Sequence, residues 1–237
     1  MVMSDPSPAA SDPHDAPTAT ARCSCSLAAW LWLLAAGVMI VAGFAGFDRW
    51  FYEHVSLVLN NEARPLDRGF YAVTKPFWET CRWVFGSPLG VLVLFGGAVF
   101  LRPTRWRLYA AGLIGITVAA LLANVAQGAI GRLRPNQAAS ALTFAPPFSE
   151  LLTKERVCFP SGEAATAFAL ACVAARFLPR WRAAFYAIAG LTAAARLVNG
   201  AHYVSDVVAG AVFGVVVAGL LFRWLSRLSS GAQVERS

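Results

Sequence analysis

Long apolar stretches separated by short polar segments dominate the chain after residue 25. Most of the stretches hold about 16 to 24 residues, and about 20 apolar residues in a helix cross the hydrocarbon layer of a bilayer. A backbone in lipid must satisfy its own hydrogen bonds, so helices are expected rather than open strands. The pattern predicts six membrane-spanning helices, at about 26–46, 86–101, 108–130, 162–178, 183–199 and 203–223.

The polar ends of the chain set the predicted domain limits. Residues 1–25 are rich in Pro, Ser, Asp and Ala without periodicity, which predicts a disordered cytoplasmic tail. The tail lacks the basic start of a secretory signal, so the first span is expected to be retained. We therefore expect a six-span domain at 26–225 and a short C-terminal tail at 226–237.

The segment between the first two spans, at about 47–85, mixes aromatic and charged residues. Amphipathic aromatic side chains settle at the membrane–water interface, so this loop is expected to contain interfacial helices. The aromatic residues concerned are Trp50, Phe51, Tyr52, Trp78 and Trp83. The predicted fold class is all-α, an integral membrane six-helix bundle.

Composition supports this class and excludes others. Hydrophobic residues make up 57% of the 237 residues and charged residues 14%, whereas a soluble domain has about 25% charged residues. An ordinary soluble enzyme and a long disordered protein are both excluded. The net charge is +7, but the basic residues are scattered between apolar runs rather than gathered in one patch. No nucleic-acid partner is expected.

Arginines predict the orientation in the membrane, because positively charged loops remain on the cytoplasmic side. Three groups fall on one side of a six-span arrangement, together with both termini. They are Arg102, Arg105 and Arg107; Arg176, Arg180 and Arg182; and Arg223 and Arg227. We expect a multi-pass protein of the cell inner (plasma) membrane, whose opposite side faces the periplasm or the outside.

Three polar clusters fall on that opposite side, at residues 127–135, 159–163 and 196–206. Their chemistry suits phosphate. Arg134 and Arg196 offer planar forks of donors that match phosphate oxygens. Ser161 and Gly162 open a predicted helix, whose N-terminus attracts anions.

His202 and Asp206 complete the pattern. They are four residues apart and share one helix face. A carboxylate that holds one imidazole nitrogen leaves the other basic and directed, as a nucleophile requires.

These motifs resemble the type 2 phosphatidic acid phosphatase superfamily of membrane lipid phosphatases. The family pattern has a Lys with Arg-Pro seven residues on, then Pro-Ser-Gly-His, then Ser-Arg with a His and an Asp at fixed spacing. The resemblance covers about residues 86–223. The matching positions are Arg134 and Pro135; Pro160, Ser161 and Gly162; and Arg196, His202 and Asp206.

The resemblance implies a six-helix enzyme with its site on the non-cytoplasmic side. His202 would attack phosphorus and carry a phosphohistidine, and Asp206 would orient it. The phosphate oxygens would be held by Arg134, Arg196, Ser161 and the amide of Gly162. Neither a metal nor a cofactor is implied.

Three positions depart from the family pattern, namely Gln127 for the Lys, Glu163 for the second-motif His, and Ala195 for a Ser. Gln127 keeps hydrogen-bond donors but loses a charge, which Arg132 or Lys154 could supply.

Glu163 replaces the family's general acid. A carboxyl can protonate a leaving group if it is itself protonated, and the alternative is a first-turn carboxylate that favours the helix dipole. His54 is another candidate acid. Cys81 and Cys158 both fall on the outer side, where they form a disulfide or remain free.

We predict a metal-independent phosphatase that hydrolyses a lipid phosphate within the bilayer. Phosphatidic acid, phosphatidylglycerol phosphate, polyprenyl pyrophosphate and lipid A phosphate all remain open as substrates. An impaired relative that only binds lipid phosphate and a lipid phosphotransferase are the alternatives. A transporter would need charges buried within the spans, and the spans hold too few. The oligomeric state is not predicted.

Overall fold

The computed structural model describes residues 19–56, 76–77, 79–80, 83–84, 87–101, 106–150 and 156–234. Within these ranges the chain is helical, and its only β-structure is two isolated antiparallel bridges, Arg132–Phe144 and Leu133–Val157. The chain divides into two compact units, Met1–Ala35 and Ala36–Ser237. In the first unit the described residues form the start of a helix; the second contains all the features discussed below.

Each of the six predicted apolar segments coincides with a helix. The helices are α1 (Ala19–Ala42), α5 (Pro88–Leu101), α6 (Trp106–Ile130), α7 (Gly162–Phe177), α8 (Arg182–Val198) and α9 (Val204–Val234). The first helix, α1, begins at Ala19 and the last helix, α9, ends at Val234, so these two helices extend into the two predicted tails.

Three helical stretches in the described ranges are long and apolar enough to cross a membrane: Ala29–Val55, Trp106–Ile130 and Val204–Arg227. This supports a multi-pass membrane protein. The helices α5, α7 and α8 have 14, 16 and 17 residues, or about 21–26 Å at 1.5 Å per residue. Six crossings therefore remain a prediction.

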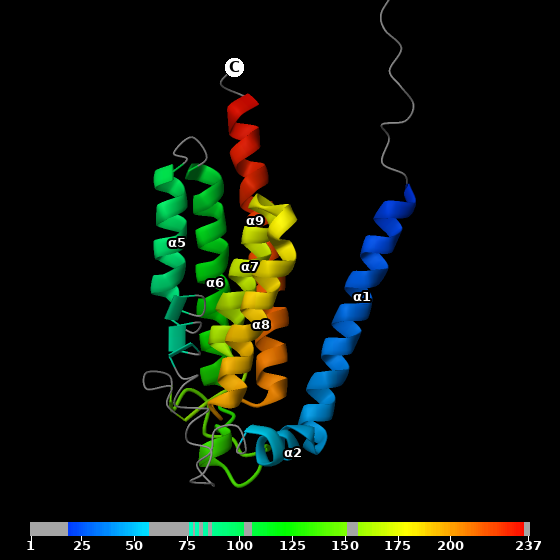
Figure 1. Cartoon of the computed structure of the whole chain (residues 1–237), viewed down its shortest axis with the longest axis vertical. Helices are drawn as coiled ribbons and strands as arrows, with labels where there is room; N and C mark the ends of the chain where they lie inside the picture. Colours follow the sequence, from blue (N-terminus) through cyan, green and yellow to red (C-terminus); the bar gives the residue numbers. More distant parts are fainter. Residues whose placement is uncertain are drawn as a thin grey trace, which may run out of the picture. The chain divides into compact units, whose positions relative to one another are not determined.

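The chain after α1 stays helical but changes direction. A π-helical turn (Gly43–Phe47), the short helix α2 (Asp48–Phe51) and a second π-helical turn (Tyr52–Ser56) follow one another. Gly46 has φ +121°, a conformation that favours glycine, and it interrupts the helical path. In Figure 1, α2 lies at the same end of the helices as the loop that follows α6.

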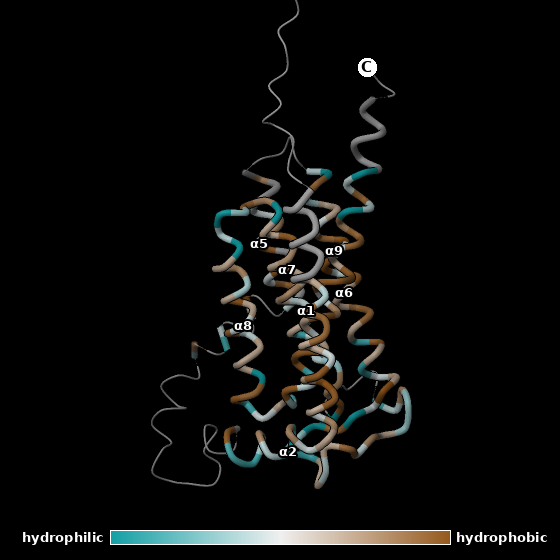
Figure 2. Tube along the Cα trace, turned by 90° about the vertical axis from the view of Figure 1, so that its right-hand side faces the viewer, coloured by the Kyte–Doolittle hydropathy of each residue, from teal (hydrophilic) through white to brown (hydrophobic). Residues whose placement is uncertain are grey.

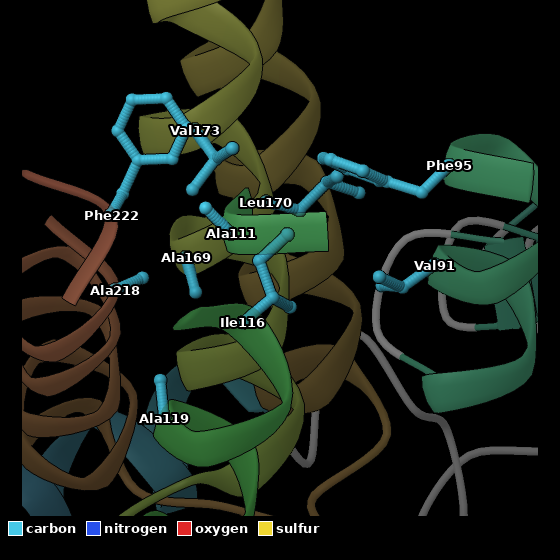
Figure 3. Close-up of a cluster of buried hydrophobic side chains, with 10 residues drawn as sticks. All are labelled: Val91, Phe95, Ala111, Ile116, Ala119, Ala169, Leu170, Val173, Ala218 and Phe222. Atoms are coloured by element: carbon cyan, nitrogen blue, oxygen red, sulfur yellow. The ribbon is translucent and has the colours of Figure 1, made fainter. Parts of the chain in front are cut away.

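The helices α6, α7 and α9 pack side by side, with α5 against α6 and α8 against α7 (Figure 1). Figure 3 shows one buried cluster, to which Phe95, Ile116, Val173 and Phe222 contribute from four different helices. Figure 2 shows hydrophobic residues along the middle of α6 and α9 and hydrophilic residues near the loops. The apolar core thus occupies the middle of the helices and leaves their loop end for polar groups.

Very close packing of α7 on α9 fixes the loop end. A Cβ atom on Gly210 would lie 2.3 Å from the carbonyl oxygen of Ser161, and one on Gly214 would lie 2.1 Å from that of Ala165. Small residues allow such approach between membrane helices. The start of α7 is therefore pressed against α9, which brings the second polar cluster to the third.

Candidate functional site

The three polar clusters meet at the backbone of Val157 and Cys158. The Val157 carbonyl accepts hydrogen bonds from Gln127 Nε2 at 2.9 Å and Arg134 Nε at 3.3 Å. The next carbonyl, of Cys158, lies 2.9 Å from His202 Nδ1. The segment just before the second cluster thus links the first cluster to the third.

His202 is 4% exposed and lies in the turn between α8 and α9. A carbonyl oxygen only accepts hydrogen bonds, so Nδ1 carries the proton that it donates to Cys158, and the lone pair is on Nε2. Asp206 Oδ2 is 3.8 Å from Nδ1. The direct hydrogen-bond partner of the imidazole is therefore a backbone carbonyl, with the expected carboxylate at longer range.

Burial lowers the pKa of His202 below its usual 6.5, and the positive charge of Arg196 lowers it further. Asp206 and Glu163 raise the pKa, but not enough to offset the loss of water. The ring is therefore neutral at neutral pH, and the Nε2 lone pair is available to a phosphorus atom.

Asp206 is buried and connects all three clusters. Its Oδ1 accepts a hydrogen bond from Arg132 Nη1 at 2.7 Å, and its Oδ2 accepts one from the amide of Tyr203 at 2.8 Å. Its backbone carbonyl accepts a third from the amide of Ser161 at 2.9 Å. Asp206 thus holds the His202 turn and the start of α7 together.

Arg132 is fully buried, and it does not supply the charge that Gln127 lacks. Its Nη1 donates to Asp206 and to Ser205 Oγ, each at 2.7 Å, and its Nη2 donates to Asp48 Oδ2 at 2.9 Å. The terminal nitrogens of the guanidinium are therefore bound within the protein. We call Asp48, Arg132, Ser205 and Asp206 the buried ion cluster. Lys154, the other residue considered for the missing charge, lies outside the described residues.

Sequence reasoning missed Asp48. A single aspartate after an apolar span is typical of the membrane interface, where a carboxylate meets water. In the structure its relative exposure is 1%.

A second ion pair joins the other two charged site residues. Arg196 Nε, in the last turn of α8, lies 2.5 Å from Glu163 Oε2, in the first turn of α7. The side chain of Glu163 is 31% exposed, unlike the carboxylates of the buried ion cluster. Two predicted site residues, the phosphate-binding Arg196 and the candidate acid Glu163, therefore bind each other.

Ser161 and Gly162 form the start of α7 as predicted. Ser161 is buried and is the N-cap, whose Oγ accepts a hydrogen bond from the Ala164 amide at 3.4 Å. A Cβ atom on Gly162 would lie 2.9 Å from Asn124 Oδ1, so a side chain at this position would require the Asn124 amide group to move.

The remaining candidates lie as follows. Gln127 is buried, and its side-chain amide donates a hydrogen bond to the Val157 carbonyl, as described above. Cys158 is a free, buried thiol that donates to the Leu133 carbonyl at 3.2 Å, and burial raises its pKa well above 9.0. Cys81 lies outside the described residues. His54 Nδ1 donates to the Trp50 carbonyl at 2.9 Å, and its ring stacks on Trp50.

The profile of the PAP2 superfamily matches residues 108–230, more than half of the chain. The chain belongs to the PAP2 superfamily. The matched region contains all the motifs on which the resemblance rested, so that interpretation is confirmed.

Lipid A 1-phosphatases are among the relatives of this PAP2 protein. That of Rhizobium etli is 41% identical over 100 residues, which cover 42% of this chain and 42% of the relative. That of Porphyromonas gingivalis is 30% identical over 132 residues, or 54% of this chain and 26% of the relative. The chain therefore matches less than half the length of these relatives.

Two solved structures share the fold. A PAP2-type phosphatidylglycerolphosphate phosphatase from Bacillus subtilis aligns over 84% of this chain and 94% of its own, with TM-score 0.55 and 21% identity. LpxE from Aquifex aeolicus aligns over 72% of this chain and 94% of its own, with TM-score 0.50 and 20% identity. At these identities the similarity shows the fold alone.

Proposed function

We propose that this protein is a membrane lipid phosphatase in which His202 forms a phosphohistidine. The observation that carries the proposal is the buried, neutral imidazole, whose Nδ1 proton is held by the Cys158 carbonyl 2.9 Å away. This tautomer leaves Nε2 as the nucleophile. The lipid substrate would approach from the bilayer at the loop end, on the periplasmic side of a six-span inner-membrane protein.

The reaction has two steps. In the first, His202 Nε2 forms a bond to phosphorus, the bond from phosphorus to the lipid oxygen breaks, and that oxygen takes a proton. In the second, water attacks the phosphohistidine, which releases inorganic phosphate and restores the imidazole. Arg134, Arg196 and the Gly162 amide are suited to hold the phosphate oxygens, because they are cationic or polarised donors.

Glu163 is our proposed general acid. In the structure Glu163 Oε2 is paired with Arg196 Nε at 2.5 Å. A phosphate that takes over Arg196 would free the Glu163 carboxyl group to reach the leaving oxygen. Substrate binding would thus prepare the acid for the leaving oxygen.

Lipid A 1-phosphate is our proposed substrate. Relatives at 41% identity are named lipid A 1-phosphatase. The 1-phosphate is a glycosyl phosphate, and its leaving hydroxyl is more acidic than that of an ordinary alcohol. Such a leaving group needs less help from an acid, which suits a site that has Glu163 in place of a histidine.

The test is phosphate release by the purified protein in detergent from lipid A bisphosphate, phosphatidic acid, phosphatidylglycerol phosphate and polyprenyl pyrophosphate. We expect lipid A to lose its 1-phosphate, identified by mass spectrometry, and a ³²P label to be trapped on the wild-type protein. His202→Ala should abolish both signals. The matched control is His54→Ala, which removes the exposed histidine stacked on Trp50 and should behave as wild type.

Other outcomes have defined meanings. Preferred release from another lipid would overturn the substrate and retain the mechanism. Release by His202→Ala at the wild-type rate would overturn the mechanism. Transfer of the label to a second lipid would identify a phosphotransferase. Binding of lipid phosphate without turnover would identify an impaired relative, an alternative that the Gln127 and Glu163 positions favour.

A further inference from the structure

Asp48 lies outside residues 108–230, which carry the family motifs, and yet it is bound to them. Its Oδ2 accepts hydrogen bonds from Arg132 Nη2 at 2.9 Å and from the Ser205 hydroxyl, and its Oδ1 accepts one from the Ser205 amide at 2.9 Å. Both oxygens are therefore used. The side chain of Asp48 is fully buried, as is that of Arg132.

The surroundings of Arg132 show that the cluster is built as a unit. Besides its bonds to the cluster, Arg132 Nε donates to the Ala141 carbonyl at 2.8 Å. The rings of Phe44 and Tyr203 lie 4.3 Å and 4.4 Å from its guanidinium carbon. Buried charges are tolerated only when their partners are placed this fully. Phe44 and Asp48 both come from the segment after α1.

Two carboxylates hold the turn that carries His202. Asp206 binds the Tyr203 amide, and Asp48 binds the Ser205 amide. These amides are one and three residues after His202. Arg132 bridges the two carboxylates, so a shift of Asp48 would be passed to Asp206 and to the turn.

We propose that Asp48 is a positioning residue for the reaction, which fixes the His202 turn through Ser205 and through the Arg132–Asp206 pair. The proposal rests on the proposed role of His202. Asp48 touches neither the substrate nor the reacting atoms. Its contribution is to keep the nucleophile in place and to balance the charge of Arg132.

The charge balance gives the proposal a signature that a purely structural role lacks. The buried ion cluster holds one cation and two carboxylates, a formal charge of −1. The charged groups that act on His202 in the described residues are Asp206, Arg196 and Glu163, with Arg132 behind Asp206. Loss of the Asp48 charge leaves Arg132 balanced only by Asp206, so the potential at His202 becomes more positive.

The variant to test is Asp48→Asn. Asparagine has nearly the same size, but its NH₂ group must face a donor of either Arg132 or Ser205. We expect kcat to fall by about 10²-fold, as a small misplacement of a reacting group can cause, while KM changes by less than about threefold. Turnover is expressed per trapped phosphohistidine site, so that unfolded protein does not count.

The second readout is the His202 titration by NMR of protein labelled at histidine. The chain has three histidines. The imidazole signal that is missing from the spectrum of His202→Ala is the signal of His202. We expect Asp48→Asn to lower the pKa of His202 by about 0.5–1 unit, as removal of a charge several ångströms away does in a partly shielded site. The matched control is Glu53→Gln, which removes the exposed partner of Arg49 and should leave kcat and the titration unchanged.

A wild-type kcat per site and an unchanged His202 titration in Asp48→Asn would overturn the proposal. Should this variant fail to fold, Ser205→Ala removes only the hydroxyl between Arg132 and Asp48, and we expect it to lower kcat per site; an unchanged kcat there would overturn the proposal. Wild-type protein that releases no phosphate, or an active His202→Ala, would overturn the proposed function instead. In that case the NMR titration still tests the link from Asp48 to His202.

Discussion

Two groups of paired arginine and carboxylate side chains lie near His202, and they differ in burial. In the buried ion cluster, Arg132 and its two carboxylates have 0% side-chain exposure. In the other pair, Arg196 and Glu163 are 6% and 31% exposed. The side chains of the buried ion cluster make further hydrogen bonds. Glu163 Oε2, in contrast, accepts no aligned hydrogen bond among the described residues.

This difference in burial indicates which charged groups hold the site together and which can bind a ligand. The Arg132 guanidinium is fully buried and each of its three nitrogens already donates a hydrogen bond, so it is not placed to bind a ligand. The Arg196–Glu163 pair exchanges partners at lower cost, because Glu163 is 31% exposed and water and a ligand can reach it. We therefore assign the buried ion cluster to the framework of the site and the Arg196–Glu163 pair to its contact with phosphate.

Arg132→Gln should give the largest effect on stability. It would leave two buried carboxylates without a cation, and breaking such a pair from one side costs about 3–5 kcal/mol. The measurement is the free energy of unfolding in detergent. The matched control, Arg156→Gln, removes an arginine that is 55% exposed from its pair with Glu150 and should cost less than about 1 kcal/mol. Equal losses in the two variants would contradict the assignment.

Gly43→Ala tests how closely the segment after α1 approaches α9. A Cβ atom there would lie 2.6 Å from Ser205 Cβ and 2.8 Å from the Asp48 carboxylate oxygens. We expect a loss of about 1–3 kcal/mol in unfolding free energy, typical of overpacking. Gly37→Ala is the matched control, because it has nothing within 4 Å. A Gly43→Ala protein as stable as this control would show that the segment does not dock closely.

Glu163→Gln should cost less stability than Arg132→Gln, because glutamine keeps a hydrogen-bond acceptor beside the buried Arg196, and it should also change ligand binding. Inorganic phosphate, measured as a competitive inhibitor, should bind up to about fivefold tighter once the carboxylate no longer competes for Arg196. Loss of the acid should also lower kcat, more for phosphatidic acid than for lipid A. Weaker phosphate binding would argue that Glu163 helps to hold the ligand. Glu150→Gln is the control.

The helices were largely predictable, and the path of the segment between them was not. Apolar runs of membrane length leave little choice of secondary structure, so α6 and α7 begin and end close to the predicted limits. The path after α1 depends on one glycine with φ +121°, Gly46, and on partners far away in the sequence. No local pattern identifies Asp48 as buried, because its partner Arg132 is 84 residues away.

Within the site, the sequence spacing predicted which side chains would lie close together, but not which hydrogen bonds each of them would make. The four-residue interval predicted His202 and Asp206 on one helix face; the two groups lie 3.8 Å apart, but His202 precedes α9 and lies in the turn before it. The closest partner of the imidazole is a backbone carbonyl, which leaves no mark on the sequence. Arg132 and Arg134 are two residues apart and of one type, and only the positions of Asp48 and Asp206 decide which of them is buried.

The smallest expected effect is on the pH dependence, where Arg196 and the carboxylates Asp206 and Glu163 act on His202 in opposite directions. Burial and Arg196 lower the pKa of the imidazole below 6.5, and Asp206 opposes them. Protonation removes the Nε2 lone pair, so the nucleophile is lost as pH falls through this lowered pKa. At pH 6.5 more than half of the imidazole should therefore be neutral. Arg196→Gln should raise the NMR midpoint of His202, opposite to the shift expected for Asp48→Asn. A wild-type midpoint above 6.5 would mean that the carboxylates of the two pairs outweigh burial.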